Sequence, residues 1–311
     1  MKVLVVGAGS IGKRHHGNLL ELGADATLRG WRGYELSGFE AEVADYDAVV
    51  IATATEMRLP LIQAAVDAGK PLYIEKPLAA TLQEVEAIEA ICGPVADRSV
   101  LGYMMRYHPA FRALAQADLS DVFQFSLTIG HDVTQWRQNW KFSESYAARP
   151  EGGGVLLDLC HEIDMASCLF PNLSVVDVQS HGHAAYEGVD MASRISLRGA
   201  NVSGEVTMDY LTPRLHRRAI LRGVDRCHDF DFAAQNYRLS DLTGERTLDL
   251  PLERNAMFLS ITRDFLSLAA GKPPSDVEHL PRLDLALPSA KLTAKARAAR
   301  QFIATIAKEI P

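Results

Sequence analysis

The chain has 311 residues, of which 48% are hydrophobic and 23% are charged, and its net charge is −7. This composition is typical of soluble globular proteins. The length favours two modest domains over one large domain, and the negative charge argues against a surface that binds nucleic acid or an anionic membrane. No apolar run approaches the length that a membrane-spanning helix needs.

The cysteines and the N-terminal residues favour a cytoplasmic protein. The four cysteines contain no C-x-x-C pair and lie in apolar surroundings, so we expect free thiols rather than a disulfide framework. The first residues, MKVLVVGAGS, run straight into glycines and are too short for the apolar region of a secretion signal. We also expect no metal, because no group of His, Cys and Asp residues shows metal-ligand spacing.

Strand-like and helix-like segments alternate over the first part of the chain. Apolar, β-branched segments predict strands at 2–6, 25–29, 48–52, 72–75 and 99–105. Amphipathic segments between them predict helices that end at Leu22, Gly69 and Gly93. This alternation predicts an α/β domain of residues 1–105, with a doubly wound parallel sheet of the Rossmann type.

The pattern changes after residue 105. From there, alternating polar and apolar residues with closely spaced turn signals predict an antiparallel sheet, and a helix is expected over 152–170. The expected strands are 122–131, 175–185, 190–199, 201–210, 216–223 and 228–232, with 245–251 as a further candidate. Helices are expected from about Asn255 onward. Residues 106–311 are therefore expected to form a second α/β domain, of the α+β type, on a mostly antiparallel sheet.

The segment GAGSIG has the spacing G-x-G-x-x-G and lies between a predicted strand and a predicted helix. In this context Gly7 permits the tight turn, Gly9 lets the backbone approach a pyrophosphate, and Gly12 lets helix and strand pack closely. Ser10 and Ile11 begin the helix, whose free N–H groups point at the phosphates. The sequence therefore predicts a site for NAD or NADP.

The end of the second predicted strand bears on the choice between these cofactors. An acidic residue at this place is typical of NAD binding, and here the chain has Arg29, with Arg32 close behind. Two arginines are suited to a 2′-phosphate, so the sequence slightly favours NADP. The alternative is that Arg29 stacks on the adenine or faces water.

Several motifs along the whole chain resemble those of the Gfo/Idh/MocA oxidoreductase family. They are GAGSIGKRH, IATATEM, IEKPLA, GYMMRYHP and GGGVLLDLCHEID, in the family's order. The resemblance implies a Rossmann domain followed by an α/β domain whose sheet covers the nicotinamide. The chain departs from the family's pattern at Ala54 and Arg58, where Pro and His are common, and at Met105, where Asn is common.

The resemblance implies catalytic roles for Lys76, Asp158 and His161. Asp158 and His161 are three residues apart, so on a helix they share one face. His161 is expected to exchange the alcohol proton, because the usual pKa of histidine suits both directions of reaction. Asp158 would bind a neighbouring hydroxyl or fix the imidazole. Lys76 would hold the reacting oxygen and a cofactor ribose hydroxyl, or would itself be the main acid–base group.

Further site residues are expected around these groups. Thr53 and Glu75 end two Rossmann strands and are expected on the cofactor side, with a structural anchor as the preferred role of Glu75. Candidate substrate contacts are Arg106, Tyr107, Trp140 and Tyr146. The alternatives are that Arg106 bridges the domains in an ion pair and that the aromatic residues cap the sheet.

These features together predict an NAD(P)-dependent oxidoreductase that acts on a secondary alcohol or ketone. The expected substrate is a polyhydroxylated small molecule: a sugar, a sugar derivative or a cyclitol. One alternative is an oxidoreductase with the same hydride-transfer chemistry whose substrate is a non-sugar imine or diol. Another is a regulator that senses a dinucleotide and has no turnover. The sequence EKP at residues 75–77, Asp158 and His161 are all present, which favours an enzyme. The resemblance also implies a homodimer or homotetramer formed through the open face of the antiparallel sheet.

Overall fold

A computed structural model describes residues 1–136, 141–275, 279–307 and 310. The chain folds into two compact units. The first consists of Met1–Tyr107 and Glu253–Lys291, and the second of His108–Leu252 and Leu292–Pro311. The expected division placed everything after residue 105 in the second domain. The structure differs because residues 253–291 return to the first unit.

The first unit is built on a parallel five-stranded sheet with the order β2-β1-β3-β4-β5. Its strands are β1 (Lys2–Val6), β2 (Asp25–Arg29), β3 (Ala48–Ile51), β4 (Leu72–Ile74) and β5 (Val100–Leu101). Every residue of β3 and β4 is buried. This burial explains their continuous apolar sequences, because helices cover both faces of a parallel sheet. The predicted Rossmann sheet is confirmed, although β5 is shorter than expected.

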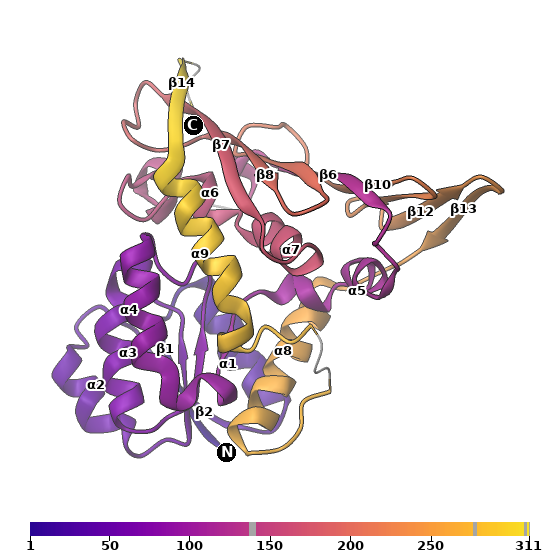
Figure 1. Cartoon of the computed structure of the whole chain (residues 1–311). Coiled ribbons are helices and arrows are strands. Elements are labelled where there is room, and N and C mark those ends of the chain that lie inside the picture. Colours follow the sequence, from indigo (N-terminus) through magenta and orange to yellow (C-terminus); the bar gives the residue numbers. More distant parts are fainter. Residues whose placement is uncertain (137–140, 276–278, 308–309, 311) are drawn as a thin grey trace. The chain divides into compact units, whose positions relative to one another are not determined.

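Helices cover both faces of this sheet. The α-helices of the first unit are α1 (Ser10–Glu21), α2 (Leu36–Val43), α3 (Arg58–Asp67), α4 (Leu82–Cys92) and α8 (Arg254–Ala269), and the 3-10 helices are η1 (Thr55–Met57), η2 (Gly93–Arg98) and η3 (Met104–Tyr107). Figure 1 shows α1 and α8 on one face and α2, α3 and α4 on the other. Asn255 of α8 donates to Asn18 of α1 at 3.0 Å, which explains how the C-terminal segment packs on the first unit.

The second unit contains a nine-stranded sheet with the order β13-β12-β11-β10-β6-β9-β8-β7-β14. Its strands are β6 (Val122–Gly130), β7 (Ser174–His183), β8 (Ala192–Arg198), β9 (Ser203–Asp209), β10 (His216–Gly223), β11 (Arg226–Asp231), β12 (Asn236–Asp241), β13 (Gly244–Asp249) and β14 (Arg300–Ile306). All neighbours are antiparallel except the pairs β6–β9 and β7–β14. The expected mostly antiparallel sheet is confirmed.

The second unit also contains short helices. They are α5 (Pro109–Gln116), α6 (Val155–Asp158) and α7 (His161–Leu169), with η4 (Val133–Gln135), η5 (Phe142–Glu144) and η6 (Tyr146–Ala148). Helix α9 (Leu283–Ala299) begins in the first unit and ends in the second. Within the described ranges of the chain, no helix combines the length and apolar character needed to cross a membrane.

The prediction of one continuous helix over 152–170 is wrong. Leu159 has φ −99° and ψ 27°, outside the helical region, so α6 ends at Asp158 and α7 begins at His161. The break contains neither Gly nor Pro, and therefore no local signal predicts it. Asp158 and His161 therefore do not share the face of one helix. The relative position of their side chains depends on the turn between α6 and α7.

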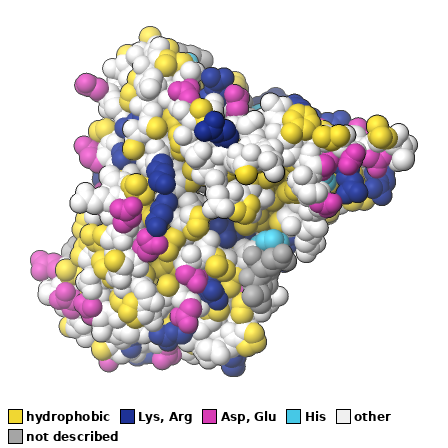
Figure 2. Space-filling view, viewed as in Figure 1, with side chains coloured by type: hydrophobic (Ala, Val, Ile, Leu, Met, Phe, Trp, Pro, Cys, Tyr) yellow, Lys and Arg dark blue, Asp and Glu magenta, His cyan; other side chains and the backbone are white. Residues whose placement is uncertain are grey.

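Strands β10 to β13 carry charges of both signs. The carboxylate of Asp229 on β11 accepts hydrogen bonds from Arg218 on β10 and from Arg238 on β12. In Figure 2, basic and acidic side chains lie side by side on this part of the sheet. The arginine-rich run of β10 is therefore partly neutralised by its neighbouring strand.

Candidate functional site

The glycine turn between β1 and α1 requires residues without side chains. Gly7 has φ +113°, and a Cβ there would lie 2.4 Å from the carbonyl oxygen of Ala52. A Cβ at Gly12 would lie 1.7 Å from the carbonyl oxygen of Gly7. The N–H of Gly7 also donates to the carbonyl of Arg29 at 2.8 Å. These contacts bring the turn, the start of α1 and the ends of β2 and β3 together.

The backbone beside this turn has one open position, at Gly9. A Cβ on Gly9 would have no atom within 4 Å, so the backbone there is open to an approaching group. Ser10 is exposed at the start of α1, where helix N–H groups lack partners within the helix, and Ile11 is half-buried. Thr53, which follows β3, has a buried hydroxyl without a hydrogen-bond partner among the described residues. A ligand hydroxyl or phosphate would satisfy this hydroxyl.

Arg29, at the end of β2, is held by an acidic residue of α2. Its Nε and Nη2 donate to the carboxylate of Glu42 at 3.2 and 2.8 Å. Glu42 also accepts from the hydroxyls of Tyr34 and Tyr46. Burial favours a raised pKa for Glu42, but the hydrogen bonds from Arg29 and the two tyrosines outweigh it and lower the pKa. Arg32 lies exposed in the turn after β2.

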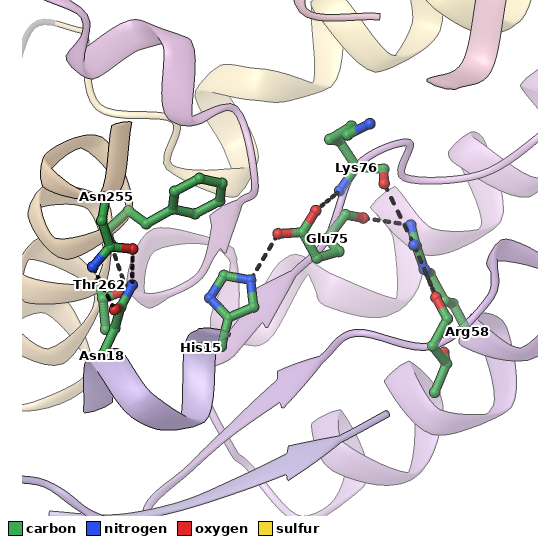
Figure 3. A network of polar contacts seen from close by, with 9 residues as sticks. His15, Asn18, Arg58, Glu75, Lys76, Asn255 and Thr262 are labelled. Atoms are coloured by element: carbon green, nitrogen blue, oxygen red, sulfur yellow. Dashed lines mark hydrogen bonds and ion pairs between the residues drawn. The ribbon is translucent and has the colours of Figure 1, made fainter. Parts of the chain in front are cut away.

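Lys76 follows β4 and lies beside a buried acid, as Figure 3 shows. The N–H of Lys76 donates to Oε2 of Glu75 at 3.1 Å, and Oε1 of Glu75 lies 2.7 Å from Nε2 of His15. Glu75 is buried, which favours a raised pKa. The hydrogen bond from His15 and the positive charges of His15, Lys76 and Arg58 outweigh burial and lower the pKa of this carboxyl.

Arg58 forms the other side of this network (Figure 3). It is the first residue of α3, and its side chain is buried. Its guanidinium donates to the backbone carbonyls of Thr53, Glu75, Lys76 and Pro77. The residue that departs from the family's common histidine therefore joins the end of β3 to the turn that carries Lys76.

In the second unit, Asp158 ends α6 and is buried. Its Oδ1 accepts from the hydroxyl of Tyr146 at 2.7 Å, and its Oδ2 accepts from the hydroxyl of Tyr210 at 3.1 Å. His161 is buried at the first position of α7. The structure thus brings two predicted site residues of this unit, Tyr146 and Asp158, into contact, and adds Tyr210.

Gly153 and Gly154, which precede α6, lie close to other groups of the chain. A Cβ on Gly154, whose φ is +90°, would lie 2.3 Å from Oδ1 of Asp190, and one on Gly153 would lie 2.4 Å from the carbonyl of Ala147. Oδ2 of Asp190 accepts from the N–H of Leu156 at 2.9 Å. Burial raises the pKa of Asp190 to about 6. At these two positions the absence of a side chain therefore allows a close approach within the chain itself.

The remaining predicted contacts have partners inside the first unit or lie outside the described residues. Arg106 is buried, and its Nη2 donates to Oγ of Ser289 at 3.3 Å. The hydroxyl of Tyr107 donates to Oδ2 of Asp264 at 2.7 Å. Trp140 lies outside the described residues. Substrate binding by these three residues stays a prediction.

Sequence reasoning missed His15, Tyr210 and Asp190 as parts of these networks. Each is far in sequence from the acid or glycine that it contacts, and a single histidine or tyrosine carries no pairing signal.

In the ranges 1–136, 141–275 and 279–307, no group of three or more His, Cys, Asp or Glu side chains is placed to hold a metal ion.

The chain is similar to known oxidoreductases. Residues 30–94 match the family model described as "Oxidoreductase family, NAD-binding Rossmann fold". An inositol 2-dehydrogenase of Rhizobium meliloti is 33% identical over 128 residues, which are 36% of this chain and 39% of that protein. A UDP-N-acetylglucosamine 3-dehydrogenase of Acidithiobacillus ferrooxidans is 25% identical over 248 residues, 76% of this chain and 74% of that protein.

Solved structures share the fold over nearly the whole chain. The crystal form P212121 of the Acidithiobacillus ferrooxidans UDP-N-acetylglucosamine 3-dehydrogenase superimposes with a TM-score of 0.72 at 20% identity and covers 96% of this chain and 98% of that one. A levoglucosan dehydrogenase in complex with NADH gives a TM-score of 0.73 at 18% identity, covering 96% and 97% of the two chains. Both superpositions include both sheets of the fold.

Proposed function

We propose that the chain belongs to the Gfo/Idh/MocA oxidoreductase family, whose motifs it resembles, and that it is an NAD(P)-dependent dehydrogenase or reductase. The observation that carries this proposal is the glycine turn, where Gly7 and Gly12 admit no side chain and the buried hydroxyl of Thr53 lies at the neighbouring strand end. Dinucleotides bind at this place in doubly wound sheets. The substrate is a secondary alcohol or ketone of a sugar, a sugar derivative or a cyclitol, as the names of the relatives suggest.

The nicotinamide, when bound, donates or accepts the hydride. The residues of the chain handle the oxygen and its proton. Lys76 holds the reacting oxygen, and its positive charge stabilises an alkoxide as it develops. His161 takes up the alcohol proton in oxidation and returns it in reduction. Asp158, oriented by Tyr146 and Tyr210, binds a neighbouring hydroxyl or orients the imidazole.

Arg29 and Arg32 support NADP over NAD. Arg32 is exposed, and the side chains of the Arg29–Glu42 ion pair are 45% and 21% exposed. An exposed ion pair contributes about 0–1 kcal/mol, so a doubly charged phosphate competes for Arg29. A fluorescence titration that gives tighter NADH than NADPH binding would refute this preference.

We also propose a cytoplasmic homodimer or homotetramer. Strands β8 and β9 alternate buried apolar residues with polar ones, so one face of the sheet is polar and partly exposed. A second copy that packs on this face would cover it. Sedimentation at micromolar concentration should give particles larger than the 34.1 kDa monomer, and monomers alone would contradict the proposal.

Turnover on a panel of cyclitols, sugars and sugar nucleotides tests the function. The wild type should reduce or oxidise NAD(P) with at least one member. Lys76→Ala and His161→Ala should each reduce kcat by about 100-fold or more while the Kd for NADH changes little. Unchanged kcat and pH profile in His161→Ala would move the acid–base role to Lys76. Tight cofactor binding without turnover on any panel member would favour the non-catalytic regulator.

A further inference from the structure

We propose that Arg58 is a positioning residue that holds Lys76 in place by binding the backbone around it. This inference rests on the proposed function, since it presumes that Lys76 contacts the substrate. Arg58 is only 4% exposed and lies at the start of α3. A buried guanidinium loses its water, so its N–H groups need acceptors in the protein.

Arg58 donates to backbone carbonyls at two neighbouring strand ends. Nε and Nη2 donate to the carbonyl of Thr53, after β3, at 3.3 and 3.0 Å. Nη1 donates to the carbonyls of Glu75 and Pro77, on either side of Lys76, after β4. Nη2 also lies 3.5 Å from the carbonyl of Lys76. One rigid side chain thus fixes the spacing between the end of β3 and the turn after β4 (Figure 3).

The opposite side of Lys76 is fixed by Glu75. This carboxylate accepts from the N–H of Lys76 at 3.1 Å and is itself held by His15, 2.7 Å away. The backbone of Lys76 is therefore bound at its N–H by an acid and at the surrounding carbonyls by Arg58. A flexible lysine side chain samples a smaller volume when its backbone is fixed, and small displacements of a catalytic group lower the rate strongly.

A lysine at position 58 keeps the charge but cannot bind several carbonyls in one plane. We expect Arg58→Lys to lower kcat about 10–100-fold, because a misplacement of about 1 Å in an active site can cost about 100-fold in rate. The Kd for NADH should change less than about threefold, because the glycine turn is untouched. Arg282→Gln is the matched control. Arg282 lies in the same unit and pairs with Asp284 in a surface contact, so kcat should not change.

A double-mutant cycle separates positioning from general structural damage. If Arg58 acts through Lys76, Arg58→Lys should have little further effect on kcat in a Lys76→Ala background. Multiplying losses in the double variant would overturn the inference, and so would unchanged kcat in Arg58→Lys. Full activity of Lys76→Ala would instead refute the proposed role of Lys76. The two failures are therefore distinguishable.

Hydrogen exchange gives a second readout that needs no turnover. In Arg58→Lys and Arg58→Gln, exchange of the backbone amides of Glu75, Lys76 and Leu78 should be at least about threefold faster than in the wild type, while 10–21 in α1 stays protected. Unchanged exchange at these three amides would overturn the inference. If both variants lose the cooperative thermal transition, Arg58 is required for folding of the unit, and the positioning role is likewise overturned.

Discussion

Both the nucleotide site and the fold require that residue 12 has no Cβ, which is why it is glycine. A Cβ at this position would lie 1.7 Å from the carbonyl oxygen of Gly7, so the backbone would have to shift to admit a side chain. We expect Gly12→Ala to abolish measurable NADH binding and to lower the free energy of unfolding by about 2–4 kcal/mol, since overpacking against backbone strains the turn. Fluorescence titration and denaturant unfolding measure the two effects.

Gly17 provides the control on the same helix. A Cβ there would meet no atom within 4 Å. Gly17→Ala should keep NADH binding and raise the free energy of unfolding by about 0.5–1 kcal/mol, because alanine favours the helix interior. Equal NADH affinity in both variants would contradict the assignment of the turn.

The residues that form the site differ in how far the sequence predicts them. The glycine turn is local, so its spacing predicts a strand, a turn and a ligand at the strand end, and the resemblance implies the role of the Lys76 motif. The partners of Glu75 and Asp158 are not local. His15 is 60 residues from Glu75, and Tyr210 is 52 from Asp158. Only the folded sheets bring these pairs together.

At the scale of secondary structure, α4 shows a start signal that the sequence predicts fully. Thr81 accepts from the N–H of Glu84, and the Glu84 carboxylate accepts from the N–H of Thr81. Thr81→Ala should lower the free energy of unfolding by about 1 kcal/mol, because it removes this cap. Gln83→Ala, at an exposed position in the same turn, should change the free energy by less than about 0.5 kcal/mol. Equal effects in urea unfolding would contradict the role of the cap.

Other elements escape prediction for physical reasons. The break between α6 and α7 is stabilised by tertiary contacts of Asp158, and no Gly or Pro lies within it. Strand β14 follows α9 without an intervening turn and pairs in parallel with β7. Its sequence, RQFIATI, continues a long helical pattern, so only the partner strand determines that it is extended.

At the scale of the whole molecule, ionisation of Asp190 should contribute to the pH dependence of the free energy of unfolding. Burial raises its pKa from 3.8 to about 6, and the N–H of Leu156 and the charge of Arg300 oppose this only in part. Between these two pH values the folded state binds a proton that the unfolded state has lost. This group therefore makes stability fall as pH rises through the window, by roughly 2–3 kcal/mol, with no further change above it.

Asp190→Asn should remove this component. Asparagine keeps an oxygen that accepts from the N–H of Leu156, while it carries no charge. The difference in free energy of unfolding, variant minus wild type, should grow between about pH 4 and pH 6 and then stay constant. Denaturant unfolding at a series of pH values measures it, and a difference independent of pH would show that Asp190 ionises normally in the folded protein.

The proposed oxidoreductase function requires dinucleotide binding at the glycine turn of the first unit. The most direct test is a nicotinamide fluorescence titration of the wild type and of Gly12→Ala with NADH and NADPH. We predict saturable binding by the wild type, tighter for NADPH, and none by the variant. If the folded wild type binds neither nucleotide, the proposed oxidoreductase function is contradicted.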